Sequence, residues 1–121
     1  NVPAFIYASR EDHIVPWRTA YTSTALLGGD TTFVLGASGH IAGVINPPAK
    51  GKRNHWVGKV QEDSQAWLDN AQSVPGSWWP AWTTWLSDHG GSKVTAPKRL
   101  GNRKNPVIEP APGRYVKEKA S

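Results

Sequence analysis

Two apolar segments near the start of the chain have the length of strands. Residues 2–9 and 31–37 are almost continuously apolar and lack the polar alternation of a half-exposed strand. Such runs are typical of parallel strands covered on both faces. Between them, residues 17–27 place apolar side chains at helical spacing, and a Gly-Gly-Asp turn at 28–30 ends the pattern. The order strand, helix, strand predicts a βαβ unit with a right-handed connection.

The middle of the chain predicts two further helices. Residues 62–72 favour a helix that turns Trp67 and Leu68 inward, and we interpret Ser77 as the N-cap of the next helix. Pro80 is tolerated in the first turn of that helix. One stripe of it carries Trp78, Trp82, Trp85 and Leu86. We expect this stripe to pack against a core or a partner surface rather than to stack on sugars or bases.

The pattern as a whole predicts an α/β protein made of two regions. Residues 1–90 carry a net charge of −1 and should form the fold, whereas residues 91–121 hold eight basic side chains against two acidic ones and read as a basic, Pro- and Gly-rich tail. Two parallel strands leave faces and edges open, so we expect neighbouring strands from outside this segment. The chain opens without methionine, and we expect a cut piece of a longer protein that folds incompletely alone.

Composition excludes several kinds of function. The absence of cysteine excludes disulfides, cysteine-ligated zinc and cysteine catalysis within these residues. No apolar run approaches the ~20 residues of a membrane span, so we expect a soluble protein. The net charge of +5 belongs to the tail, where aromatic side chains other than Tyr115 are absent among the basic ones, and no nucleic-acid partner is expected. His13, His40 and His55 lack metal-motif spacing, and neither a metal nor a cofactor is expected.

Polar side chains follow both predicted parallel strands. Asp12 lies in the loop after the first strand, and His40 lies in the turn after the second. Open α/β sheets place their sites at this edge. The α/β-hydrolase order is nucleophile, acid, histidine, and these two residues match its last two positions. The alternatives are that Asp12 only forms a turn and that His40 is structural.

The sequence Gly36-Ala37-Ser38-Gly39-His40 does not provide the nucleophile. A nucleophile elbow ends in glycine and precedes the acid, whereas this segment ends in histidine and follows Asp12. We therefore interpret Ser38 as a turn residue.

The loops around Asp12 and His40 resemble those of one family. Tyr7–Trp17 (YASREDHIVPW) and Gly36–Pro48 (GASGHIAGVINPP) resemble class I polyhydroxyalkanoate synthases. Shorter similarities cover nearly all of the remaining chain, at Lys52–Trp56, Gly76–Pro80 and Ile108–Val116. The resemblance implies the C-terminal portion of an α/β-hydrolase fold, in which the βαβ unit is followed by tryptophan-rich helices and a basic tail.

The resemblance also implies an acyltransferase. Class I synthases polymerise (R)-3-hydroxyacyl-CoA into a storage polyester and release CoA. Asp12 would be the catalytic aspartate, with a further role in activating the 3-hydroxyl group, and His40 would be the catalytic histidine. The cysteine nucleophile would lie upstream of this chain, so the fragment alone should be inactive. A cytoplasmic homodimer attached to polyester granules is also implied, with the acyl-CoA and the growing polyester chain as partners.

Two other functions stay open at this point. An α/β-hydrolase, such as a lipase or a polyester depolymerase, would share the acid and the histidine but transfer the acyl group to water. A non-catalytic module could instead use the aromatic helix and the tail to bind a polymer or a partner. We interpret His13 as a residue that closes the Asp12 loop rather than one that tunes Asp12.

Overall fold

The computed structural model describes residues 1–119 and divides the chain into two compact units. The first unit runs from Asn1 to Gly91 and contains the sheet and the α-helices described below. The second begins at Ser92, and its described residues are irregular apart from a 3-10 turn at Tyr115–Lys117. Among the described helices, none has the length and apolar character needed to cross a membrane.

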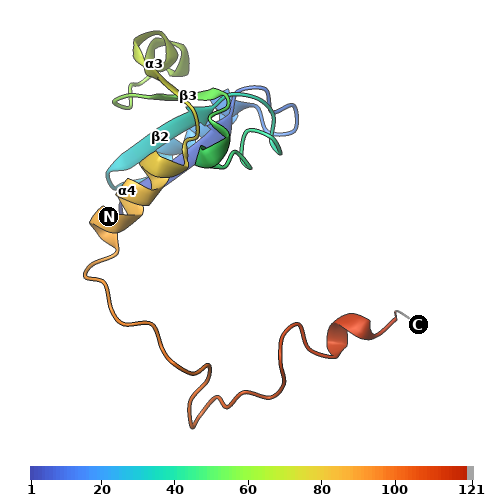
Figure 1. Cartoon of the computed structure of the whole chain (residues 1–121). Coiled ribbons are helices and arrows are strands. Elements are labelled where there is room, and N and C mark those ends of the chain that lie inside the picture. Colours follow the sequence, from blue (N-terminus) through green and yellow to red (C-terminus); the bar gives the residue numbers. More distant parts are fainter. Residues whose placement is uncertain (120–121) are drawn as a thin grey trace. The chain divides into compact units, whose positions relative to one another are not determined.

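The predicted βαβ unit is confirmed. Strands β1 (Ala4–Ser9) and β2 (Thr31–Gly36) pair in parallel, with Ala4 opposite Thr31 and Ser9 opposite Gly36. Both predicted strands are therefore present and lie side by side, as Figure 1 shows. Their carboxyl ends meet at one edge of the sheet.

The connection between these strands differs from the prediction of one helix over residues 17–27. It consists of two short helices, α1 (Trp17–Tyr21) and α2 (Ser23–Leu26), which meet at Thr22. The Thr22 hydroxyl donates to the carbonyl of Thr19 at 2.7 Å. Three consecutive Thr and Ser residues begin at this point, and such side chains compete for backbone hydrogen bonds that would otherwise continue a helix.

The sheet contains two antiparallel strands that the sequence pattern did not predict. β3 (Asn54–Val57) pairs with β2, and β4 (Gln72–Pro75) pairs with β3, which gives the order β1-β2-β3-β4. A mixed sheet with helices confirms the α/β class. The expectation that neighbouring strands must come from outside is wrong for β2, since β3 covers its second edge. For β1, the described residues supply a partner on one edge only.

One face of the sheet carries the core. Helix α3 (Ser64–Asn70) begins after Asp63, whose Oδ1 accepts the N–H groups of Gln65 and Ala66 at 2.9 Å. The helix brings Trp67 onto the sheet, as predicted, and its Nε1 donates to the carbonyl of Gly58 at 3.2 Å. Six buried side chains form the core cluster: Ala8, Trp17, Tyr21, Phe33, Leu35 and Trp67.

The opposite face of β1 packs against helix α4 (Trp79–His89) and the residue before it. Phe5 and Tyr7 alternate along the strand with the core-facing Ile6 and Ala8, and α3 and α4 lie on opposite sides of the sheet in Figure 1. The Tyr7 ring stacks on Trp78 with centroids 4.2 Å apart.

Helix α4 begins two residues beyond the predicted cap. Ser77 nevertheless acts at this end of the helix, because its Oγ accepts the N–H of Trp79 at 3.0 Å. Trp85 lies 5.8 Å from Phe5 between ring centroids, whereas Trp82 and Leu86 remain 41% and 42% exposed. The predicted packing of the tryptophan stripe is therefore confirmed for Trp78 and Trp85, whereas Trp82 and Leu86 leave part of the stripe open.

Candidate active site

The loop after β1 fixes the carboxylate of Asp12. Its Oδ1 accepts the N–H of Ile14 at 2.8 Å and that of Val15 at 3.1 Å. These two hydrogen bonds are the main reason why the pKa of Asp12 lies below its ordinary value. The imidazoles of His40 and His13 lower this pKa further, so His13 does influence Asp12, contrary to the interpretation from the sequence. The side chain is therefore a carboxylate at neutral pH.

His40 stands at the start of a tight turn after β2. Ser38, which lies in this turn as predicted, has a φ of 76°, a conformation uncommon outside glycine. The N–H of Gly43 donates to the carbonyl of Gly39 at 2.8 Å. A Cβ atom on Gly43 would lie 2.8 Å from Ser9 Oγ, so the turn packs tightly over the end of β1.

Backbone hydrogen bonds join the two loops to each other. The N–H of Arg10 donates to the carbonyl of Gly36 at 2.8 Å, and the N–H of Glu11 donates to the carbonyl of Ser38 at 3.0 Å. The loops that carry Asp12 and His40 are thus held to each other by backbone hydrogen bonds. Their relative position follows from the pairing of β1 with β2.

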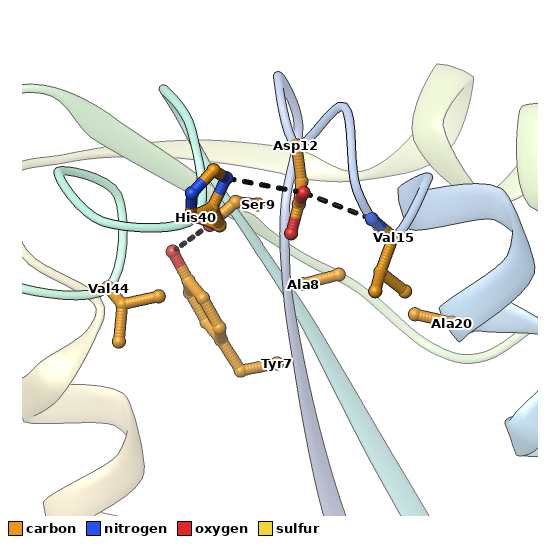
Figure 2. A pocket seen from close by; sticks show the side chains of 8 residues that line it. All are labelled: Tyr7, Ala8, Ser9, Asp12, Val15, Ala20, His40 and Val44. Carbon is orange, nitrogen blue, oxygen red and sulfur yellow. Dashed lines mark hydrogen bonds and ion pairs between the residues drawn. The ribbon is translucent and has the colours of Figure 1, made fainter.

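The structure brings the two predicted site residues together. Nδ1 of His40 lies 3.5 Å from Oδ1 of Asp12, and Figure 2 shows the two groups facing each other. Nδ1 is buried and, within residues 1–119, has no hydrogen bond to another group. The distance exceeds that of a strong hydrogen bond. A carboxylate facing Nδ1 favours a proton there and leaves Nε2 free to accept one.

A pocket of about 220 Å³ lies against this pair. Its walls combine polar and apolar side chains, namely Tyr7, Ala8, Ser9, Asp12, Val15, Ala20, His40 and Val44. The hydroxyl of Tyr7 lies 3.0 Å from Ser9 Oγ, and in Figure 2 it points toward Ser9 and His40. Burial raises the pKa of Tyr7, so this hydroxyl is protonated at neutral pH.

Tyr7 and Ser9 were not predicted as pocket residues. The signal was present in the sequence, because residues two apart on a strand share a face and Ser9 ends the strand just before the Asp12 loop. The continuous apolar run hid that alternation. Only the folded position of the turn that carries His40, which packs on Ser9, shows that Tyr7 and Ser9 line the pocket.

The other two histidines considered from the sequence have different positions. His13 is exposed, and its ring centroid lies 5.1 Å from that of His40 in an edge-to-face arrangement. His55 is buried in β3, with Nδ1 3.2 Å from the carbonyl oxygen of Gly76. In the part of the chain that the structure describes, no three His, Cys, Asp or Glu side chains gather in a way that could hold a metal ion.

Comparison with known proteins finds that the chain is similar to poly(3-hydroxyalkanoate) polymerases. It is 61% identical, over 99% of its length, to poly(3-hydroxyalkanoate) polymerase subunit PhaC of Cupriavidus necator. The chain is homologous to part of the poly(3-hydroxyalkanoate) polymerases. The polymerase subunit PhaC of Rhizobium etli is 44% identical over 98% of the chain, and poly(3-hydroxyalkanoate) polymerase 2 of Ectopseudomonas oleovorans is 44% identical over 96%. No family model matches.

The predicted resemblance is confirmed by these polymerases. The chain spans about a fifth of their length: 20%, 19% and 21%, respectively. Because the match to the Cupriavidus necator polymerase covers 99% of the chain, the shared segment includes both site loops.

Proposed function

We propose that this chain supplies the acid and the histidine of a class I polyhydroxyalkanoate synthase, within the C-terminal part of an α/β-hydrolase fold. The enzyme would polymerise (R)-3-hydroxyacyl-CoA into polyester and release CoA. The observation that carries the proposal is the 3.5 Å approach of His40 Nδ1 to Asp12 Oδ1 at the carboxyl ends of two adjacent parallel strands. The names of the homologous polymerases support the substrate class.

The first half of the reaction would form an acyl-enzyme. This chain contains no cysteine, so the nucleophilic thiol would belong to another segment of the longer protein. Nε2 of His40 would take the thiol proton, and the thiolate would attack the thioester carbonyl of the substrate. The imidazolium would then return its proton to the departing CoA thiolate. Asp12, a carboxylate at neutral pH, would orient the ring and stabilise its positive charge.

The second half would form the ester bond. The 3-hydroxyl of a bound hydroxyacyl group would lose its proton, with the help of Asp12, as its oxygen attacks the carbonyl carbon of the next thioester. The C–S bond of that thioester would break, and the released thiolate would take up the proton. Water must be excluded at this stage, because hydrolysis would give a free hydroxy acid instead of polymer. The apolar walls of the pocket, Ala8, Val15, Ala20 and Val44, support that requirement.

A homodimer attached to polyester granules in the cytoplasm is part of the same proposal. The partly exposed Trp82 and Leu86 on α4 offer apolar surface that could bind a second protomer or the granule. Light scattering of the purified longer protein would show the dimer, and co-sedimentation with isolated granules would show attachment. A monomer that stays in the supernatant would contradict this part of the proposal.

Product analysis tests the chemistry. The longer protein that contains this chain is mixed with (R)-3-hydroxybutyryl-CoA, and both thiol release and insoluble polyester are measured. We expect both from the parent protein and neither from the His40→Gln variant. His89→Gln is the matched control, because His89 is exposed at the end of α4 and should leave both products unchanged. The 121-residue chain alone should release no thiol.

The products also discriminate between the alternatives. Thiol release with free 3-hydroxybutyrate and no polyester would favour the hydrolase. No thiol release from the parent protein would overturn the synthase proposal and favour the binding module.

A further inference from the structure

Two indole groups at the start of α4 donate hydrogen bonds to the turn that carries His40. Nε1 of Trp78 donates to the carbonyl of Gly43 at 3.2 Å, and Nε1 of Trp79 donates to the carbonyl of Val44 at 2.9 Å. Each pair is 35 residues apart in the chain. Two adjacent indoles thus attach to two adjacent carbonyls of the same turn.

Trp78 is itself fixed against the sheet. Its ring stacks on Tyr7 with centroids 4.2 Å apart and an interplanar angle of 26°. The hydroxyl of Tyr7 also lies within hydrogen-bond distance of Ser9 Oγ. The turn that carries His40 packs on Ser9. The indole therefore connects β1 to the backbone of the turn from one side, while Ser9 supports the turn from below Gly43.

Among the described residues, no hydrogen bond holds the imidazole of His40 through its buried Nδ1. Nδ1 lies 3.5 Å from Asp12, and the ring also lies against the exposed His13. Its position must then follow the backbone of the turn. A displacement of about 1 Å in a catalytic group costs on the order of 10²-fold in rate.

We infer that Trp78 and Trp79 are positioning residues that hold the turn from His40 to Val44 so that Nδ1 of His40 keeps facing Asp12. This inference rests on the proposed function. The two indoles act through the turn backbone and touch no reacting atom, so their loss should affect the rate of the chemical step more than substrate binding. Phenylalanine at either position keeps an aromatic ring but removes the N–H donor.

The test uses the longer protein with Trp78→Phe and Trp79→Phe, measured for thiol release from (R)-3-hydroxybutyryl-CoA. We expect kcat to fall roughly 5- to 50-fold, with KM within about twofold, because the removed interactions act on catalysis rather than on uniform binding. Trp85→Phe is the matched control. It lies on the same helix and packs on Phe5, and the described residues show no hydrogen bond from its indole. Its kcat should stay within about twofold of the parent.

A thermal unfolding midpoint is measured for each variant to separate positioning from folding. Variants that lose kcat while keeping a midpoint like that of Trp85→Phe support the inference. Unchanged kcat in both Trp78→Phe and Trp79→Phe, with an active parent and an inactive His40→Gln variant, would overturn the inference and leave the proposed function intact. An equal loss of kcat in Trp85→Phe would overturn it as well. A parent without thiol release would overturn the proposed function, and this inference with it.

Discussion

Oδ1 of Asp12 connects the imidazole of His40 to the backbone of its own loop. The same oxygen lies 3.5 Å from His40 Nδ1 and accepts the N–H groups of Ile14 and Val15. An asparagine oxygen could still accept both backbone hydrogen bonds, but it carries no negative charge. The loop geometry and the charge beside His40 can therefore be separated by one substitution.

Replacing Asp12 by asparagine should remove catalysis while preserving the fold. We expect kcat for thiol release by the longer protein to fall about 10³- to 10⁴-fold, the size of loss seen when a triad carboxylate becomes an amide. Asp88→Asn, an exposed position on α4, should leave kcat unchanged. A loss below about tenfold for Asp12→Asn would show that the carboxylate does not act on His40.

Asp12 should also make stability depend on acid pH. Its pKa is lowered on folding from the ordinary value of 3.8, so the unfolded chain binds its proton more readily than the folded chain. The stabilisation is therefore complete above about pH 5 and is lost as the pH falls through the lowered folded pKa. The difference in urea midpoint between the parent and Asp12→Asn should stay constant from pH 7 to 5 and shrink below pH 4. A difference that grows toward acid pH would contradict the direction of the shift.

Gly43 should not tolerate a methyl group. An alanine Cβ at Gly43 would lie 2.7 Å from the Gly39 carbonyl oxygen and 2.8 Å from that of Ala37, so the turn backbone would have to move. We expect Gly43→Ala to lower the stability of the longer protein by about 1–3 kcal/mol and to reduce thiol release with it. Gly39→Ala is the control, since its Cβ would meet Glu11 at an ordinary 3.7 Å. Equal effects of the two substitutions would exclude this packing explanation.

The core cluster should depend strongly on Trp67. This side chain is fully buried between the sheet and α3, and its indole also donates to Gly58. Trp67→Ala should lower the free energy of unfolding of the longer protein by about 3–5 kcal/mol, as measured by urea titration with circular dichroism. Trp82→Ala, at a position that is 41% exposed, should cost clearly less. A similar cost at both positions would mean that the core does not centre on α3.

The meeting of Asp12 and His40 could be predicted from the sequence for a simple reason. Two fully apolar strands joined by a helical connection are typical of a parallel βαβ unit, in which the carboxyl ends of both strands meet at one edge. Asp12 and His40 follow closely after the ends of β1 and β2, and backbone hydrogen bonds such as Arg10 to Gly36 join the two loops. The proximity of the two residues followed from strand order, although its catalytic role stays a prediction.

The second half of the sheet could not be predicted in the same way. β3 and β4 have four residues each, too few to establish a period, and Gln72 and Ser73 are exposed on the outer strand. The hydrogen bonds that Trp78 and Trp79 donate could not be predicted from the sequence either. Helical spacing showed which residues share a stripe, but it gives no information on carbonyl groups 35 residues away.

The most direct test of the account is a double-mutant cycle on the first turnover of the longer protein. Rapid-quench measurement of CoA release would compare the parent, Asp12→Asn, His40→Gln and the double variant. If Asp12 acts through His40 in acyl-enzyme formation, the double variant should be no more than about twofold slower than His40→Gln alone. Losses that multiply in the double variant would show that the two side chains act independently, and would contradict a catalytic pair.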